Sequence, residues 1–328
     1  MEGGTTLIAP RLGRWPESGL SVADMERLAP SLSRLLARSR VLEGPPRGLD
    51  GLLAESLGLE GSGLPWARAL LARHDRPDQE GTPLCFRLFH ARADISNALA
   101  QPAVLSKHDS SYLINDLSKE FNVNSYFDPV ASGAGILWLR GVEPPCDLPH
   151  VRDLYGQPLA AWYQRLRGHR DWYRLHNEMQ MFLHLHPLNR ERERLGQPLV
   201  NALWCWGAGE LPERPSPLSG HADDEDTRAL FALCARSSDT LEGLADRAAG
   251  CGRAVVWSAW SRILQEGAQE SLDEALQRLD RSVVAPLLEA RQPIRLLTGD
   301  GLSFVYQPAS RFLFWRRGYD WQRMAVQP

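Results

Sequence analysis

The sequence predicts an α/β fold, in which a mostly parallel sheet with flanking helices carries an inserted α+β subdomain. Amphipathic helical segments alternate with short apolar segments along most of the chain. The segment 199–207 is apolar on both faces, as is typical of a parallel strand covered on both sides. Between 84 and 141 two strand-like segments enclose a helix. We therefore expect a core over 1–83 and 187–328, and an inserted subdomain over 84–186.

The N-terminal part of the core begins with a short strand, "TTLIAPRL", at 5–12. A helix is expected over 21–39, because its leucines and Met25 recur at helical spacing and Ser21 can cap its first turn. A loop rich in proline and glycine follows at 42–51. Two more helices are predicted after it, at 52–61 and 64–74.

The middle of the chain supplies the inserted subdomain and the strand that follows it. Strands are expected at 84–94 and 135–143, around a helix at 108–121. Two further helices are expected at 158–168 and 171–186, the second ended by Pro187. The apolar segment 199–207 comes next and is expected to be a central parallel strand.

The C-terminal part returns to alternating helices and strands after a loop at 211–220. The helices are expected at 224–237, 240–250 and 271–291, the last with a kink at Pro286. The strands are expected at 253–260 and 293–301, followed by a hairpin over 302–317. In that hairpin Trp315 is expected to be buried, because both faces of the strand are apolar.

Composition restricts the classes of function. The chain has 328 residues and a net charge of −3, so it lacks the basic character of a nucleic-acid-binding domain. No apolar stretch is long enough to cross a membrane, and no signal peptide is evident. The five cysteines form no closely spaced pair, which argues against a disulfide framework or a zinc knuckle. We expect a cytoplasmic protein that contacts neither nucleic acid nor membrane.

Several segments contain residues that could form a site, each with a simpler structural alternative. Gly207 and Gly209 follow the apolar strand at 199–207, where an α/β sheet binds ligands, although they could also form a tight turn. Asp300, in "TGDG", could be a ligand or a base, or part of a turn. The acidic run 221–228 is expected to be a solvated loop whose carboxylates favour the next helix. The three histidines at 176–186 do not converge and are expected to be structural.

Two stretches resemble a known family. "LHNEMQMFLHLHPLNRERERLGQPLVNALWCWGAG" resembles a segment of the archaeal-type cofactor-independent phosphoglycerate mutases, which belong to the alkaline phosphatase superfamily. Together with the ending "RFLFWRRG", it resembles more closely the RpfE-type regulatory proteins of bacteria, which are phosphoglycerate-mutase-like. This resemblance implies an alkaline-phosphatase-like core, and it places Asn201 beside the substrate region of the enzymes.

The catalytic residues of the enzymes are not matched here. The superfamily uses two divalent metals held by Asp and His, with a Ser or Thr nucleophile. Pro10 or Arg11 stands where the first strand of the enzymes ends in a metal-binding Asp, and "RGLDGLL" (47–53) contains no serine or threonine. Asp300 is followed by Gly301 instead of histidine, and no histidine follows His221. The resemblance therefore implies neither metal nor cofactor.

Two functions remain open at this point. The first is a non-catalytic, regulatory or binding protein of this fold, acting through a protein partner or a small phosphorylated ligand. Its candidate ligand-binding residues are Asn201, Gly207, Gly209 and Asp300. The second is an active phosphoglycerate mutase or phosphatase with a rearranged metal site. The sequence carries no signal for an oligomeric state.

Overall fold

The computed structural model describes residues 4–59, 61, 63–93, 98–244, 252–266, 271–313, 315–316 and 319–324. The chain divides into two compact units. We call Met1–Glu60 with Pro212–Pro328 the core unit, and Gly61–Leu211 the inserted unit. The unit that interrupts the core is thus wider on both sides than 84–186. It also takes in the helix before 84 and the strand after 199.

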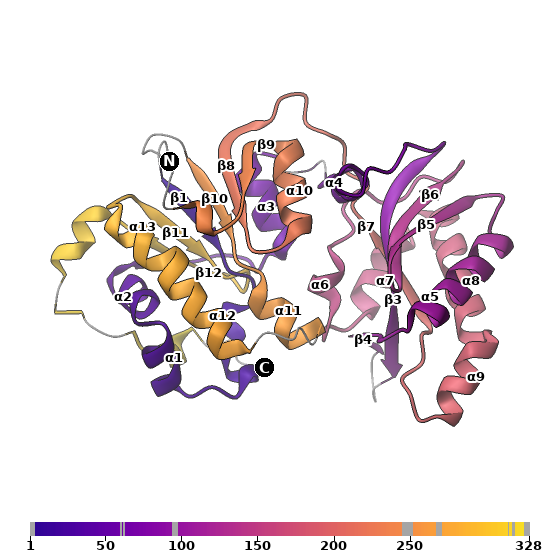
Figure 1. Cartoon of the computed structure of the whole chain (residues 1–328), viewed down its shortest axis with the longest axis horizontal. Coiled ribbons are helices and arrows are strands. Elements are labelled where there is room, and N and C mark those ends of the chain that lie inside the picture. The colour runs from indigo at the N-terminus through magenta and orange to yellow at the C-terminus, as the bar shows by residue number, and fades with distance from the viewer. Residues whose placement is uncertain are drawn as a thin grey trace. The chain divides into compact units, whose positions relative to one another are not determined.

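The core unit is built on a seven-stranded, mostly parallel sheet (Figure 1). Its strand order is β2-β12-β11-β1-β10-β8-β9. The strands β1, β8, β9, β10 and β11 run parallel, whereas β12 is antiparallel to β11 and β2 is antiparallel to β12. The bounds are β1 Thr5–Ile8, β2 Arg40–Glu43, β8 Ser216–Ala222, β9 Ala235–Asp239, β10 Arg253–Val256, β11 Ile294–Leu297 and β12 Leu302–Tyr306.

Helices cover both faces of this sheet. Leu7, Val255 and Leu296 point to one face, where they share a core with α1, α2, α12 and α13. In Figure 1, α2, α12 and α13 lie together beside the sheet. The helices α3 and α10 pack on β1 and β8. The bounds are α1 Val22–Leu28, α2 Pro30–Arg38, α3 Leu49–Leu57, α10 Glu225–Cys234, α11 Ala259–Glu266, α12 Leu272–Arg278 and α13 Ala285–Glu289. A π-helical segment, Leu279–Val284, joins α12 to α13, and short 3-10 helices span Leu12–Ser18, Glu242–Leu244, Pro308–Phe312 and Trp321–Arg323.

The inserted unit has its own antiparallel sheet. The long strand β3 pairs with β6 and also with β4 and β7, and β5 pairs with β6. The strand bounds are β3 Thr82–Ala93, β4 Ala98–Pro102, β5 Ser125–Ala131, β6 Ala134–Leu139 and β7 Ala202–Trp206. The helix bounds are α4 Trp66–Arg73, α5 Lys107–Glu120, α6 Val151–Leu154, α7 Ala160–Leu166, α8 Arg170–Leu185 and α9 Pro187–Arg194. No described helix combines the length and apolar character needed to cross a bilayer.

The prediction of an α/β fold with a mostly parallel sheet and flanking helices is confirmed, but the place of β7 was predicted wrongly. All five residues of β7 are buried, as its apolar pattern indicates. The strand nevertheless pairs antiparallel with β3 in the inserted unit, so it is not a central parallel strand of the core. Helices such as α8 pack on β7. An antiparallel strand that is covered in this way has the same apolar pattern as a parallel one.

Other corrections concern short strands and the C-terminus. The predicted loop at 211–220 contains most of β8, and β9 occupies the end of the predicted helix at 224–237. Among its described residues, the predicted hairpin at 302–317 contains a single strand, β12, which a 3-10 helix follows. Trp315 is 63% exposed, so its predicted burial is wrong. The predicted helix at 240–250 begins as a short 3-10 turn, and 245–251 lie outside the described residues.

Candidate functional site

The candidate site of the core unit lies where its parallel strands end. Because β1, β8, β10 and β11 are parallel neighbours, their carboxyl ends meet at one edge of the sheet. Pro10 follows β1 there, Asp223 and Asp224 follow β8, Ser258 follows β10, and Asp300 follows β11. Pro10, Gly207 and Asp300 each follow an apolar segment, so the sequence predicts that the three residues meet at one edge of a single sheet. For Pro10 and Asp300 this is confirmed at the level of the sheet edge, because β1 and β11 are parallel neighbours.

Asp224 is a helix cap rather than an open ligand. One carboxylate oxygen accepts the backbone N–H of Thr227 at 3.0 Å, which caps the first turn of α10. The other oxygen accepts the hydroxyls of Thr227 at 2.8 Å and of Ser258 at 2.9 Å. These bonds satisfy both oxygens of a buried side chain.

Asp223 holds the start of the next helix. It accepts the backbone N–H of Ser258 at 2.8 Å, immediately before α11, and it shares the single proton of the Ser258 hydroxyl, 3.0 Å away, with Asp224. Its other oxygen accepts a guanidinium N–H of Arg262 at 2.9 Å. Its side chain is only 4% exposed, and burial together with the charge of Asp224 raises the pKa of the Asp223 carboxyl. The acidic run was expected to be a solvated loop, but these two carboxylates are buried.

Sequence reasoning did not identify Ser258 and Arg262. Ser258 lies inside the strand expected at 253–260, which ends at Val256 in the structure, and Arg262 lies two residues after that expected strand, in "WSAWSR" (257–262). A serine at the end of a parallel strand, before a helix, is the available signal for a capping position. Arg262 carries no local signal, because its partner Asp223 is far away in the sequence.

Asp300 sits in the turn that joins β11 to β12. Its Oδ1 accepts the Thr298 hydroxyl in a short hydrogen bond and the backbone N–H of Leu302 at 3.4 Å. Its Oδ2 is buried and has no hydrogen-bond partner among the described residues. The carboxylate lies so close to Gly13 that a Cβ on this glycine would overlap it. Asp300 thus combines the role of a turn residue with one unused acceptor.

The other three candidates lie in the inserted unit, on a different sheet. The prediction that Gly207 shares a sheet edge with Pro10 and Asp300 is therefore wrong. Asn201 precedes β7, and its amide both accepts from and donates to the backbone of Ala91, at 2.8 and 3.1 Å. The oxygen and the nitrogen of the Asn201 amide thus continue the hydrogen bonding between β7 and β3.

The two glycines after β7 allow a close approach of backbones. Gly207 has a φ of 81°, and a Cβ there would lie 2.6 Å from the Cβ of Trp66 at the start of α4. A Cβ on Gly209 would lie 2.5 Å from the carbonyl carbon of Gly63. Packing against 63–67 therefore accounts for both glycines, and the tight-turn alternative describes Gly207 well.

His176 is one of three buried histidines among the described residues of the inserted unit, with His150 and His186. Its Nε2 lies 2.9 Å from the carbonyl oxygen of Leu203, and its Nδ1 lies 3.2 Å from the amide nitrogen of Gln180. This arrangement fits a neutral ring that donates from Nε2 and accepts at Nδ1. Burial lowers the pKa of His176 to about 4. Among the described residues no group of three or more His, Cys, Asp or Glu side chains is arranged to hold a metal ion.

Comparisons with known proteins gave distant structural similarities. No protein-family model matches the chain, and no curated protein matches it. Among solved structures, it is similar to the PH0037 protein from Pyrococcus horikoshii, with a TM-score of 0.46 and 15% identity over 93% of this chain and 87% of that one. It is also similar to the cofactor-independent phosphoglycerate mutase from Thermoplasma acidophilum, with a TM-score of 0.40 and 14% identity over 94% of this chain and 90% of that one.

Proposed function

We propose that this chain is a non-catalytic, phosphoglycerate-mutase-like protein that acts by binding, as the RpfE-type regulatory proteins that it resembles are expected to do. The observation that carries the proposal is the state of the acidic pair after β8. The oxygens of Asp223 and Asp224 are used to hold the first turns of two helices and to pair with Arg262. Both carboxylates therefore stabilise the structure at this edge of the sheet.

The same residues do not fit a pair of divalent metals. A two-metal site needs several carboxylate or imidazole ligands that are free to coordinate. Here a guanidinium lies 2.9 Å from Asp223, and its positive charge would repel a cation placed beside that carboxylate. Pro10 at the end of β1 and Gly301 after Asp300 offer no side-chain ligand. The described residues at this edge therefore do not form a two-metal site.

The alternative is an active phosphate-ester enzyme with a rearranged site, for which the unused Oδ2 of Asp300 is the specific observation. Elemental analysis of the purified chain, combined with phosphatase and phosphoglycerate mutase assays in added Mn²⁺ or Zn²⁺, separates the two. We expect no stoichiometric metal and no turnover. Two equivalents of retained metal, with a turnover that Asp300→Asn abolishes and the exposed control Glu225→Gln preserves, would establish the enzyme instead.

A further inference from the structure

The strand β2 forms one edge of the core sheet. Among the described strands it pairs only with β12. Arg40, Val41 and Glu43 are exposed, with Val41 at 43%. An edge strand offers unpaired N–H and C=O groups to which another extended chain can add.

The register identifies which backbone groups point outward. The N–H of Gly44 donates to the carbonyl of Gly301 at 2.8 Å, so these two residues face each other in a hydrogen-bonded position. In an antiparallel pair such positions alternate, so Leu42 and Arg40 also direct their backbone groups toward β12. Val41 and Glu43 consequently present their N–H and C=O groups to the open side of the strand.

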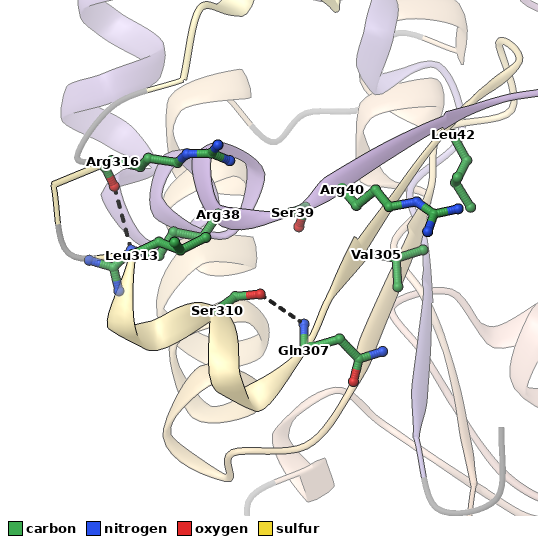
Figure 2. Close-up of a pocket in the computed structure, with 9 residues that line it drawn as sticks. All are labelled: Arg38, Ser39, Arg40, Leu42, Val305, Gln307, Ser310, Leu313 and Arg316. Carbon is green, nitrogen blue, oxygen red and sulfur yellow. Dashed lines mark hydrogen bonds between the residues drawn. The ribbon is translucent and has the colours of Figure 1, made fainter.

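An arginine-lined pocket of about 500 Å³ flanks one face of β2. Figure 2 shows Arg38 and Arg316 at one end of this pocket and Arg40 at the other, with Ser310 and Gln307 between them. No carboxylate lines the pocket, and among the described residues these three arginines form no ion pair. Arg38 makes only long bonds, of 3.5 Å, to the carbonyls of Arg311 and Arg316. The remaining lining residues are Ser39, Leu42, Val305 and Leu313.

A second pocket, of about 730 Å³, includes Val41, whose side chain points to the opposite face from those of Arg40 and Leu42. Its wall is partly aromatic, and Tyr319 packs edge-on against Phe304, the β12 partner of Val41, with ring centroids 5.7 Å apart. The other lining residues are Leu36, Ala37, Ser39, Trp315, Arg316, Asp320 and Arg323, of which Asp320 and Arg323 pair with each other at 3.4 Å.

We propose that β2 is the docking site of an extended segment of a partner protein, in which acidic and apolar side chains alternate. The segment adds to the sheet through the outward backbone groups of Val41 and Glu43. Successive side chains of a strand point to opposite faces, so its acidic residues meet Arg38 and Arg40 while its apolar residues enter the pocket beside Val41. Arg316 lines both pockets. These arginines, which form no ion pair with the described residues, set the charge of the occupant. This inference names the partner class of the proposed binding function and rests on that function.

The test is a selection of random twelve-residue peptides on the immobilised full-length chain, followed by affinity measurements on the enriched peptides. We expect enrichment of sequences that alternate Asp or Glu with apolar residues. Val41→Pro removes an outward N–H, which an edge strand tolerates, and should abolish binding while thermal melting changes little. Arg40→Glu should weaken binding by at least about fivefold through charge repulsion. The exposed Arg170→Glu, in the inserted unit, is the matched control and should bind as the wild type does.

Three results would overturn the proposal. These are no enrichment, enriched peptides that bind Val41→Pro as tightly as the wild type, and enriched peptides that are basic. Light scattering of the chain alone tests whether a second copy of the chain occupies this edge. A dimer that Val41→Pro dissociates would show that a second copy uses this edge instead. A finding of enzymatic turnover would refute the proposed function and leave these binding measurements intact, so the two failures are distinguishable.

Discussion

At the scale of single residues, buried polar groups in this chain are used to hold elements in place. Asp224 accepts hydrogen bonds from Thr227 and Ser258, and Asp223 accepts them from Ser258 and Arg262. His176 joins a helix to the strand β7 through the carbonyl of Leu203. A buried polar group that is satisfied in this way stabilises the fold, and its loss leaves its partners unpaired.

Asp224→Ala should destabilise the core unit by about 2–4 kcal/mol. The change removes a helix cap and leaves the N–H and hydroxyl of Thr227 and the hydroxyl of Ser258 without their acceptor. Urea unfolding monitored by circular dichroism measures the effect. The neighbouring Glu225→Ala removes an exposed carboxylate and should stay within about 0.5 kcal/mol of the wild type. Equal effects of the two changes would refute the capping role.

His176 should make the stability of the inserted unit depend on pH. Burial lowers its pKa to about 4, so in acid the unfolded chain binds a proton that the folded chain excludes. Its contribution is complete above the ordinary value of 6.5 and is lost as pH falls from 6.5 to 4, by about 3 kcal/mol. We expect His176→Gln to flatten this part of the stability curve. The exposed His184→Gln should keep the wild-type slope, and a His176→Gln curve parallel to the wild type would contradict the prediction.

At the scale of elements, the glycine after β7 fixes how closely this strand end approaches α4. Gly207→Ala should cost about 2–4 kcal/mol, because alanine is strained at a φ of 81° and its Cβ would lie 2.6 Å from that of Trp66. Gly196 has a φ of 66° but nothing within 4 Å of a Cβ. Gly196→Ala should therefore show the strain alone, about 1–2 kcal/mol. Chemical denaturation measures the loss in the free energy of unfolding for each variant. The difference between the two losses is the contribution of steric crowding at Gly207.

The elements also show what the sequence could and could not predict. Apolar periodicity located α2, α8 and the buried strand β7, because burial determines which residue types occur on each face. It could not predict the direction of β7 or its partner, since a strand covered on both sides is apolar in either sheet. Trp315 was predicted to be buried for a related reason, although it is exposed. An aromatic residue in an apolar run has the same local sequence pattern whether it packs in the core or lies on the surface.

The candidate site could be predicted only at the level of strand ends. Asp300 lies where the "TGDG" turn after an apolar strand places it, next to β12. The pairing of Asp223 with Arg262 depends on the parallel alignment of β8 and β10, which no local pattern encodes. The function of Asn201 depends in the same way on its distant neighbour Ala91. Long-range contacts of this kind determine which polar side chains are already used in the fold and which could still bind a ligand.

At the scale of the whole molecule, the chain contains two units that each have a sheet and a buried core. The inserted unit is one continuous segment, and its ends lie side by side, because a Cβ on Gly209 would come within 2.5 Å of Gly63. Closely spaced ends are typical of a domain inserted into another, and such domains can fold alone. Trp172 and Trp204 are fully buried within this unit and report on its packing.

We therefore expect residues 61–211, expressed alone, to fold cooperatively. Thermal melting followed by far-ultraviolet circular dichroism and by tryptophan fluorescence should give one coincident transition. The shorter segment 84–186 is the matched control, because it lacks β7, which pairs with the middle of β3, and α4, which packs on the same strand. Without them β3 loses a neighbour and its cover, so this segment should unfold without a cooperative transition. If 84–186 folds cooperatively, or if 61–211 does not, the boundaries of the inserted unit do not lie at Gly61 and Leu211.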